Sequence, residues 1–511
     1  MGYSPNGGWD EINGAVVKLS ADVLTPTNRI PLESTDGFAV GDHIVLATSL
    51  TKEFIDEVGM SGVWEPFDSN IKGVMFSRTI TNVEPGVITV DTPVRFYLKM
   101  RDDARAYHES QAIENSGIED LSIGDVQHGG VGFGPADFNI PGTAAYDVHG
   151  SHFIDVNRAR NVWIKNVSTY RPAQNTKNVH ILSNAVRVRD ASHVTLKNVH
   201  VSRPEYRGEG GNGYGFHIEG QETLLQDCSA SYQRHGGTFG TMQCSGNVIH
   251  RCTLARSTAS PFGGGGDFHR FLSQSNLIDN LTVDRDFFNA RYRPSGTPTH
   301  GITATQSVFY NIKGIAYHPR RRYIVASAQA FQGYIIGTSG PAANAIIPRD
   351  PRSGDQDWLE GERRGATLRP VSLYASQLSK RNRILSVDQV TASSFEPGHA
   401  VENTMDNDLG TSWSAEAFGA WIMYDLGEDH VLSRIGIAIY KGDERIARVQ
   451  VETSLDGMTW TSPVVLQASG TSNDTQEFDL PNGRARYVRI TSLGNTQDNS
   501  AAITEVDIYG L

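Results

Sequence analysis

The sequence predicts an all-β protein in which a coiled, repetitive β-domain is followed by a smaller β-sandwich. Three observations support this class. A short strand pattern recurs through the middle of the chain, short alternating strands dominate after about residue 384, and turn residues are abundant, with 52 Gly and 21 Pro among 511 residues. At roughly 100 to 200 residues per domain, this length provides two or three domains.

The composition excludes several classes of protein. With 38% apolar and 20% charged residues, the chain is too apolar and too weakly charged for disorder. No run of 18 apolar residues occurs, so we expect no membrane span. The net charge of -12 argues against nucleic acid as a partner. No charged-then-apolar leader follows Met1, so the chain is expected to be either intracellular or a mature secreted form whose signal has been removed.

Residues 1–110 carry strand-like runs at Val16–Leu19 and Val87–Val90, with Gly and Pro turns between them. An exposed end of a coiled β-domain invites pairing with another chain, so such a domain needs a cover at its first coil. We therefore expect residues 1–110 to form an N-terminal cap and the first coils.

The repeat lies between residues 111 and 340 and reads roughly Asn-apolar-x-apolar-x-Asn/Asp-apolar. Its successive units end at Val167, Val199, Cys228, Cys252, Leu281 and Ile312, which are 24 to 32 residues apart. An irregular period of this size is typical of a β-solenoid whose loops vary in length. Apolar residues alternate within each unit, so one strand face is expected to point into a narrow core.

The position before the end of each unit predicts a recurring turn. Asn tolerates the left-handed backbone conformation of such a turn, and its amide can bond to the Asn one coil away. Cys228 and Cys252 are expected to stack as inert core residues, and Arg251 is expected to interrupt the ladder. The turn residues are Asn166, Asn198, Asp227, Arg251, Asn280 and Asn311.

This pattern resembles the right-handed parallel β-helix of the pectate-lyase-like superfamily, over about residues 110 to 340. Residues 341–383 are rich in Gly, Pro, Arg and Asp, with a helical-looking piece at Val371–Lys380, and are interpreted as a closing cap and linker.

Residues 384–511 contain a second set of motifs, namely Asp406–Trp413, Trp421 with Tyr424–Gly427, Ser454–Gly457 with Trp460, Ala485–Ile490 and Glu505–Gly510. This set resembles an F5/8 type C (discoidin-like, jelly-roll) domain of the kind found as family 32 carbohydrate-binding modules.

The resemblance implies a structural Ca²⁺ held by Asp406, Asp408, Thr411 and Glu505, because a hard cation prefers carboxylate and hydroxyl oxygens around a tight turn. The alternative is an Asx-rich turn without metal. Ligands of such domains bind at variable loop tips, for which the candidates are Phe418, Tyr440 and Arg445.

A β-helix offers a long groove to an extended polymer, with reactive groups on neighbouring coils. Counting back from the end of each repeat places His217, His269, Arg270 and His300 in neighbouring columns, about 4.8 Å apart from coil to coil. The count does not fix which face points inward, because a one-residue slip reverses it. A cluster of His and Arg on one sheet is expected in either register.

Two reactions compete for this cluster. A lyase acting on uronic acids neutralises the carboxylate with Arg or a metal and removes the C5 proton with a base. Arg291 and Arg293 flank Tyr292, which permits two-point binding of a carboxylate from one side of an extended strand. The candidate catalytic residues are His217, His235, Asp267, His269, Arg270, Arg291, Arg293 and His300, with Tyr214 and Tyr292 as substrate-binding residues.

A hydrolase instead needs two carboxylic groups across the scissile bond, for which Asp267, Asp284, Asp286, Glu205 and Glu209 are available. The prediction is a secreted or periplasmic polysaccharide lyase acting on an acidic glycan. A glycoside hydrolase is the first alternative, and a noncatalytic glycan-binding adhesin is the second.

Overall fold

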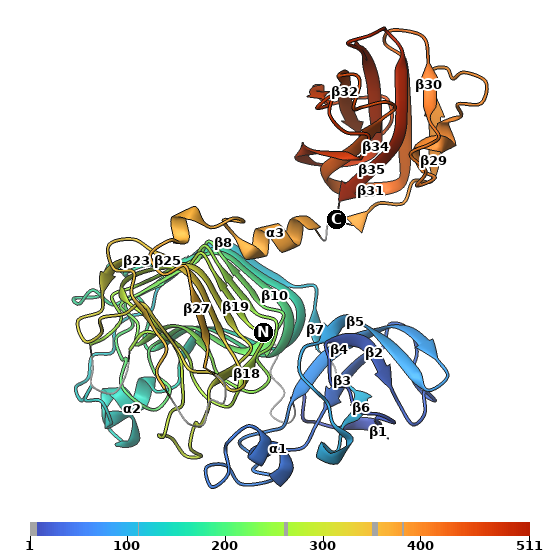
Figure 1. Cartoon of the computed structure of the whole chain (residues 1–511). Helices are drawn as coiled ribbons and strands as arrows, with labels where there is room; N and C mark the ends of the chain where they lie inside the picture. The colour runs from blue at the N-terminus through green and yellow to red at the C-terminus, as the bar shows by residue number, and fades with distance from the viewer. Residues whose placement is uncertain (1–7, 111, 260–263, 350–355, 381–382, 511) are drawn as a thin grey trace. The chain divides into compact units, whose positions relative to one another are not determined.

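The structure is a computed structural model that describes residues 8–110, 112–259, 264–349, 356–380 and 383–510. The chain divides into two compact units, Met1–Tyr374 and Ala375–Leu511, which Figure 1 shows in blue to yellow and in orange to red. Both units are built almost entirely from strands, so the predicted all-β class is confirmed. Each unit is described by itself below.

The first strands of the chain form a six-stranded antiparallel sheet in the order β1-β6-β3-β4-β5-β2 (Figure 1). The expectation that residues 1–110 contain the first coils is therefore wrong. β4 and β5 are long and are joined by the two-residue turn Pro85-Gly86, with Gly86 at φ +74°, so they pair as a hairpin. The strands are β1 (Asn13–Lys18), β2 (Thr27–Pro31), β3 (His43–Ala47), β4 (Met75–Glu84), β5 (Val87–Val94) and β6 (Arg105–His108).

This N-terminal sheet packs against the coiled domain within the first unit. Its apolar cluster includes Met242, Phe271 and Leu272, which belong to the coils. The indole of Trp64 donates a hydrogen bond to the carbonyl of Thr299, 3.0 Å away. The short helix α1 (Lys52–Glu57) is capped by the side chain of Thr51, which accepts from the Phe54 amide. The sheet thus forms a wall beside the coils.

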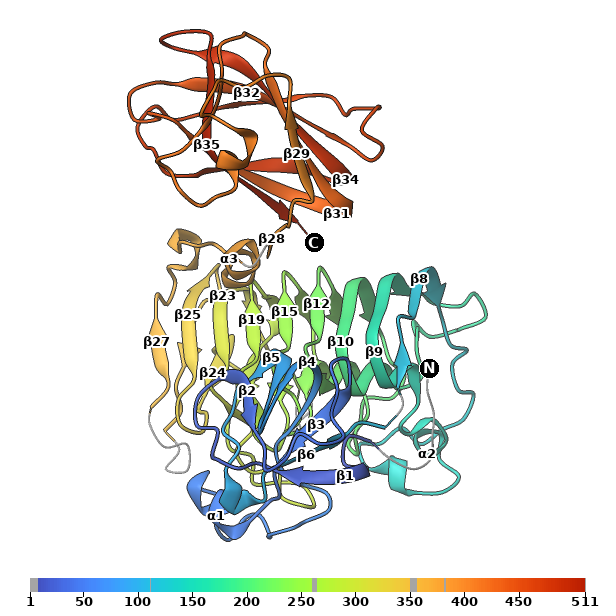
Figure 2. The same ribbon diagram turned by 90° about the vertical axis from the view of Figure 1, so that its right-hand side faces the viewer.

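The coiled domain is a right-handed parallel β-helix, as predicted, and its coils lie side by side in Figure 2. It begins at β7 and extends to β27, beyond the predicted limit of residue 340. The strands are β7 (Ile113–Glu114), β8 (Gly117–Ile123), β9 (His152–Thr169), β10 (Asn184–Ser202), β11 (Tyr214–Gln221), β12 (Leu224–Gln226), β13 (Ser229–Ser231), β14 (His235–Phe239), β15 (Val248–His250), β16 (Thr253–Ala255), β17 (Gly266–Phe268), β18 (Ser273–Gln274), β19 (Leu277–Asp279), β20 (Thr282–Asp286), β21 (Phe288–Ala290), β22 (Ala304–Thr305), β23 (Val308–Tyr317), β24 (Val325–Ser327), β25 (Tyr334–Ser339), β26 (Ala345–Ile346) and β27 (Trp358–Glu360).

The core of the β-helix contains stacked apolar side chains from successive coils. The rings of Phe239 and Phe268 lie 5.0 Å apart, and the ring of Phe309 follows 6.0 Å beyond Phe268. Cys228 and Cys252 are both buried in this core. Their thiols donate to backbone carbonyls, which supports the packing role predicted for them.

The predicted turn ladder is present. Asn198 Nδ2 donates to Asn166 Oδ1 at 3.1 Å, and Asn311 Nδ2 donates to Asn280 Oδ1 at 2.9 Å. All of the predicted turn residues have φ between +52° and +57°. Arg251 keeps the left-handed backbone, but in place of a hydrogen bond between side-chain amides it forms a two-point ion pair with Asp227, at 2.8 and 2.7 Å.

The end of the first unit is fixed to the turn ladder. The amides of Asn280 and Asn311 both donate to the carbonyl of Val371. Asp279 accepts the backbone N–H of Tyr374 at 2.8 Å. The predicted helix is found as α3 (Leu373–Lys380). The remaining helices are α2 (Ala144–Val148) and the 3₁₀ turns η1 (Met100–Asp102), η2 (Asp137–Asn139), η3 (Gly365–Thr367) and η4 (Val401–Thr404).

The second unit is the predicted antiparallel β-sandwich. Six strands follow the order β28-β35-β31-β34-β32-β33, with β29 added to β31 and β30 added to β35. Trp413 and Tyr424 are fully buried in its core. The strands are β28 (Arg383–Ile384), β29 (Gln389–Ala392), β30 (Trp413–Ala415), β31 (Trp421–Ile439), β32 (Ala447–Ser454), β33 (Val464–Gln467), β34 (Gln476–Asn495) and β35 (Ala501–Gly510).

Candidate active site

A groove on the first unit contains two neighbouring cavities. The larger, about 800 Å³, is called the arginine lobe, and the smaller, about 350 Å³, is called the paired lobe. The two share Gly211, His217 and Arg270. The arginine lobe is lined by Glu209, Tyr214, His217, Arg234, His269, Arg270, Arg291, Tyr292, Arg293, His300 and Arg321, among others.

The columns that carry these side chains differ from those obtained by counting along the repeat. Arg187 pairs with His217, which pairs with Thr238, which pairs with Asp267. Counting along the repeat places His269 in the column of Arg187, at the position where the structure has Asp267. The register between β10 and β11 shifts after Arg189, so a fixed offset from the turn fails. His217, His269, Arg270 and His300 nevertheless line one cavity.

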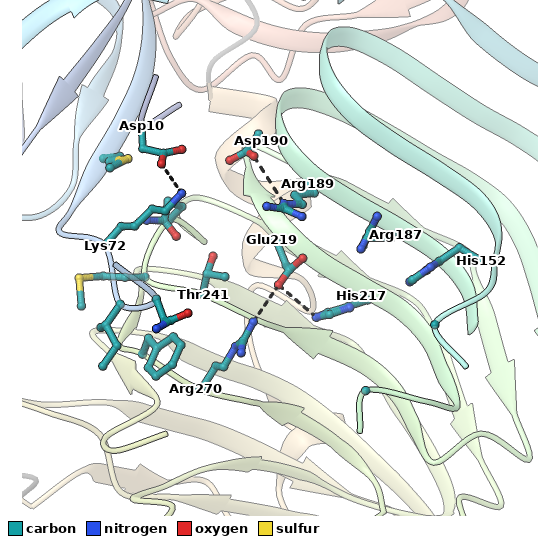
Figure 3. Close-up of a pocket in the computed structure, with 18 residues that line it drawn as sticks. Asp10, Lys72, His152, Arg187, Arg189, Asp190, His217, Glu219, Thr241 and Arg270 are labelled. Carbon is teal, nitrogen blue, oxygen red and sulfur yellow. Dashed lines mark hydrogen bonds and ion pairs between the residues drawn. The ribbon is translucent and has the colours of Figure 1, made fainter. Parts of the chain in front are cut away.

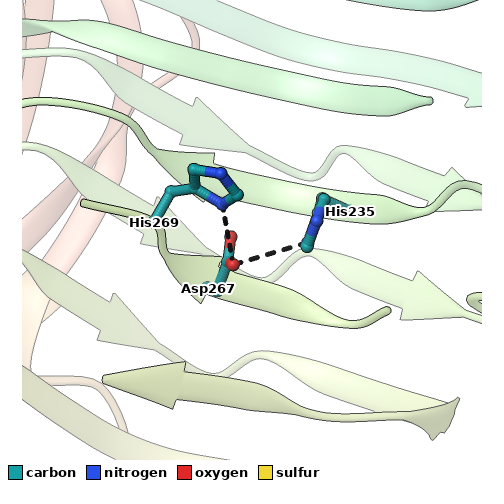
Figure 4. Close-up of side chains that lie close together, drawn as sticks. All are labelled: His235, Asp267 and His269. Atoms are coloured by element: carbon teal, nitrogen blue, oxygen red, sulfur yellow. Dashed lines mark hydrogen bonds and ion pairs between the residues drawn. The ribbon is translucent and has the colours of Figure 1, made fainter. Parts of the chain in front are cut away.

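A chain of hydrogen bonds runs across the floor of the arginine lobe. The Tyr214 hydroxyl lies 3.2 Å from His269 Nε2. His269 Nδ1 in turn lies 3.0 Å from Asp267 Oδ2, as Figure 4 shows. Because the Asp267 carboxylate only accepts, Nδ1 carries the proton and Nε2 accepts from the phenol. Arg293 also donates to Asp267 Oδ2. Arg293 therefore contacts a carboxylate of the protein itself, and the two-point binding of a substrate carboxylate by Arg291 and Arg293 stays a prediction.

The electrostatics of this chain favour a neutral imidazole beside a carboxylate. Burial lowers the pKa of His269 well below 6.5, and Arg293 lowers it further, against the opposing charge of Asp267. Burial alone would raise the pKa of Asp267, but the surrounding His235, His269 and Arg293 hold it well below 3.8. Burial raises the pKa of Tyr214, so its phenol stays protonated. The resting state contains Tyr–OH, neutral His and Asp⁻.

Three further histidines flank Tyr214 and His269, of which His217 and His300 line the arginine lobe and His235 is buried behind it. The ring of Tyr214 is stacked between His217, with centroids 4.5 Å apart, and His235, at 5.1 Å. His300 lies 4.9 Å from His269, centroid to centroid. Burial lowers the pKa of His300 to about 4 and that of His235 to about 3. These rings are uncharged near neutral pH.

Several guanidinium groups of the arginine lobe face the cavity. Arg291 and Arg321 have no carboxylate within 4.0 Å among the residues that the structure describes. Burial lowers the pKa of Arg291, and the neighbouring charge of Arg293 lowers it further. Tyr292, between the two, packs on the apolar cluster of the N-terminal sheet and also lines the lobe. The lobe thus has cationic groups available to an anion.

His235, Asp267 and His269 bring three possible metal ligands within 4.8 Å of one another. These atoms already have other partners, since His235 Nδ1 lies 2.9 Å from the Gly265 carbonyl and Asp267 accepts from Arg293. A guanidinium on the central carboxylate repels a cation. The donor set therefore fits a hydrogen-bonded proton-transfer cluster better than a metal centre.

The paired lobe contains residues that the sequence analysis missed (Figure 3). Burial raises the pKa of Asp190 to about 6. Burial opposes ionisation of Glu219, but His217 and Arg270 outweigh it and lower the pKa of Glu219 to about 2. Glu219 lies two residues after His217 on β11, a spacing that places both on one strand face. The acidic, basic and histidine residues that line this lobe and are not among the predicted site residues are Asp10, Lys72, His152, Arg187, Arg189, Asp190 and Glu219.

The other carboxylates considered for hydrolysis are dispersed. Glu209 lines the arginine lobe. Glu205 accepts the backbone N–H of His128 at 2.6 Å. Asp284 and Asp286 line neither lobe. Asp286 is buried and accepts from the Ser257 hydroxyl at 2.9 Å, and burial raises its pKa to about 7.

The predicted calcium residues of the sandwich lie together around one turn. Thr411 Oγ1 donates to Asp406 Oδ2 at 2.7 Å, and the Asp408 N–H donates to Asp406 Oδ1 at 2.9 Å. Glu505 is largely buried and accepts the Asn407 N–H at 2.9 Å. Burial raises the pKa of Glu505, and nearby Asp507 and Asp406 raise it further. Clustered carboxylates of this kind suit a hard cation.

The predicted ligand-binding residues of the sandwich come from two loops. Phe418, on the loop between β30 and β31, is 64% exposed. Tyr440 directly follows β31 and is 40% exposed, with the Arg445 guanidinium 5.7 Å from its ring centroid. Exposed aromatic rings of this kind suit stacking on sugars.

Comparison with known proteins assigns the second unit. Residues 389–506 match the F5/8 type C domain model. This part of the chain is an F5/8 type C domain, as predicted. Among the described residues, no helix is long and apolar enough to cross a membrane.

The related proteins cover limited parts of the chain. A sialidase of Micromonospora viridifaciens is 30% identical over 165 residues, which is 29% of this chain and 25% of the sialidase. The chain thus spans about a quarter of that relative. Similar solved structures include the CBM32 of AlyQ in complex with 4,5-unsaturated mannuronic acid, 33% identical over 24% of this chain and 96% of that one, with a TM-score of 0.24. A pectin binding carbohydrate binding module is 26% identical over 24% and 91%, with a TM-score of 0.23.

Proposed function

We propose that this chain is a secreted enzyme that cleaves an acidic, uronic-acid-containing polysaccharide by β-elimination. The observation that carries the proposal is the Tyr214–His269–Asp267 hydrogen-bond chain beside the guanidiniums of Arg291 and Arg321, which have no carboxylate partner among the described residues. The F5/8 type C domain, of a kind found in carbohydrate-binding modules, supports a glycan as the partner. The sialidase match supports an enzyme acting on glycans.

The first requirement of β-elimination is to acidify the C5 proton by neutralising the adjacent carboxylate. Arg291 and Arg321 line the arginine lobe and are free of described carboxylate partners. A guanidinium hydrogen-bonded to the substrate carboxylate stabilises the negative charge that develops as the proton leaves. This assigns substrate-carboxylate binding to Arg291 and Arg321 rather than to Arg293.

The second requirement is a proton path. The Tyr214 oxygen takes the C5 proton as its own proton passes to His269 Nε2, and the positive imidazole is stabilised by Asp267. The C5 electrons form the C4–C5 double bond, and the C4–oxygen bond breaks. The leaving oxygen takes the proton from Tyr214, and His269 returns its proton to the phenol. Tyr214 and His269 are then restored, with no net proton gained by the protein.

Glycoside hydrolysis is a second candidate because two carboxyl groups of the paired lobe have widely different pKa values. Asp190, with a pKa raised to about 6, suits a general acid, and Glu219, with a pKa lowered to about 2, suits a base or nucleophile. This pair replaces the Asp284 and Asp286 of the sequence-based alternative, which line neither lobe.

A product assay separates the two reactions. The purified full chain is incubated with acidic and neutral polysaccharides while ultraviolet absorbance of unsaturated uronate and new reducing ends are followed together. Elimination predicts that both rise in equal amounts. Reducing ends without absorbance would contradict elimination and favour Asp190 and Glu219, whereas no product on any glycan would favour a noncatalytic binding protein.

A further inference from the structure

The two lobes of the groove differ in how their charges are balanced. In the arginine lobe the guanidiniums of Arg270 and Arg293 are paired with Glu219 and Asp267. The guanidiniums of Arg291 and Arg321 have no carboxylate within 4.0 Å among the described residues, and Glu209 is the one carboxylate among the described residues that line this lobe. This lobe therefore has a surplus of positive charge for an anionic sugar.

In the paired lobe each cation already has its own carboxylate. Lys72 Nζ lies 2.5 Å from Asp10, and the guanidinium of Arg187 lies 2.5 Å from Asp155. The other two pairs are Arg189 with Asp190 at 3.5 Å and Arg270 with Glu219 at 3.4 Å. Figure 3 shows Asp10, Asp190 and Glu219 around this cavity.

This pairing decides which sugar the lobe accepts. A uronate there would bring its carboxylate close to Asp190 and Glu219, with no unpaired cation among the described lining residues to receive it. Like charges at such a distance oppose binding. The hydroxyl or amide N–H groups of an uncharged sugar would instead donate to these carboxylates.

We propose that the groove selects a heteropolymer, in which a uronic acid in the arginine lobe is linked to a neutral or N-acylated sugar in the paired lobe. The two lobes share Gly211, His217 and Arg270, so they are adjacent subsites. Lys72 and Asp10 come from the N-terminal part of the chain, which thereby forms part of the specificity site. This inference rests on the proposed function and specifies its substrate class.

Binding calorimetry on the full chain tests this selectivity. The Tyr214→Phe variant is used so that the ligand is not consumed. The probes are a tetrasaccharide that alternates uronic acid with N-acetylhexosamine and a tetrasaccharide of uronic acid only. We expect the alternating probe to bind at least about tenfold more tightly, a free-energy difference of about 1.4 kcal/mol.

A second substitution assigns the preference to the paired lobe. Adding Asp190→Asn removes the repulsion, so affinity for the all-uronate probe rises and the preference falls by at least about threefold. Glu219→Gln provides the same test through an independent side chain, and it also frees Arg270. Asp284→Asn is the matched control, because Asp284 lies on the same β-helix and lines neither lobe. Binding to the sandwich domain is the same in all these variants.

The outcomes are distinguishable. If neither acidic probe binds, the proposed function fails and this inference fails with it. If the all-uronate probe binds as tightly as the alternating one, or if Asp190→Asn and Glu219→Gln both leave the preference unchanged, the inference is overturned while the proposed function stands.

Discussion

His269 lies between a phenol and a carboxylate, and this position defines its proposed role. Asp267 fixes the tautomer by accepting from Nδ1, so Nε2 points its lone pair at the Tyr214 hydroxyl. Arg293 contacts the same carboxylate from the groove side. Arg293 is thus a positioning residue, which acts on the reaction through Asp267 and His269.

Arg293→Gln tests this positioning role through the pH profile. Burial lowers the pKa of His269 below 6.5, and the Arg293 charge lowers it further. The wild-type acidic limb of kcat/KM therefore lies below pH 6.5. Removing the positive charge raises the pKa of His269, so this limb moves to higher pH. A reduced rate with an unmoved limb would assign Arg293 a purely structural role.

Asp286 provides a test of residue-scale electrostatics away from the groove. Its folded pKa is about 7, against 3.8 when exposed. Because the folded state favours the protonated form, protonated Asp286 stabilises the folded state fully below pH 3.8. This stabilisation is lost as the pH rises to about 7. Asp286→Asn is expected to flatten the decrease in Tm between about pH 4 and about pH 7. Asp36→Asn, at an exposed position of the same unit, is the control. An unchanged decrease in the Asp286→Asn variant would contradict the raised pKa.

At the scale of elements, the turn ladder determines how the coils stack. Asn198→Ala removes the hydrogen bond to Asn166. It also places Ala, which lacks the side-chain amide that stabilises a left-handed backbone, at φ +54°. We expect a loss of about 1–2 kcal/mol in the free energy of unfolding of the first unit. Asn198→Gly tolerates the left-handed backbone and should lose less. Equal losses, measured by denaturant titration, would show that left-handed strain contributes nothing.

The turn ladder also shows what could be predicted from the sequence. An Asn such as Asn166 or Asn198 recurs before an apolar residue at successive turns. The preference of Asn for a left-handed turn, together with this apolar pattern, is therefore enough to indicate the coil. The facing columns could not be derived, because the register shift after Arg189 changes the offset between sheet and turn. His269 was therefore expected in the column that Asp267 occupies.

The N-terminal sheet was missed for a related reason. Alternation along β4 and β5 is the same whether strands pair in parallel or antiparallel. The Pro85-Gly86 turn was the available signal of a hairpin. Lys72 and Asp10 precede that sheet's long strands, and only the folded chain brings them to the groove.

At the scale of the whole molecule, the two compact units are expected to respond differently to calcium. We propose that Asp406, Asp408, Thr411 and Glu505 hold a Ca²⁺ ion in the second unit, as a binding-linked stabiliser of its fold. A chelator is then expected to lower the unfolding temperature of the sandwich and leave that of the β-helix unit unchanged.

Scanning calorimetry with and without Ca²⁺ measures this difference. Asp408→Asn should abolish the calcium shift, and Asp443→Asn, a substitution outside the four-residue cluster, should retain it. A calcium shift that survives Asp408→Asn would contradict the assignment of this site.

The most direct test of the central claim follows unsaturated product on an acidic glycan in variants of the proton path. Tyr214→Phe and His269→Ala are each expected to reduce the rate by about 10²-fold or more. Their controls, Tyr232→Phe and His200→Ala, change the same residue types outside the arginine lobe and should retain the wild-type rate. Formation of unsaturated product at the wild-type rate by Tyr214→Phe and His269→Ala would contradict elimination through the Tyr214–His269–Asp267 chain.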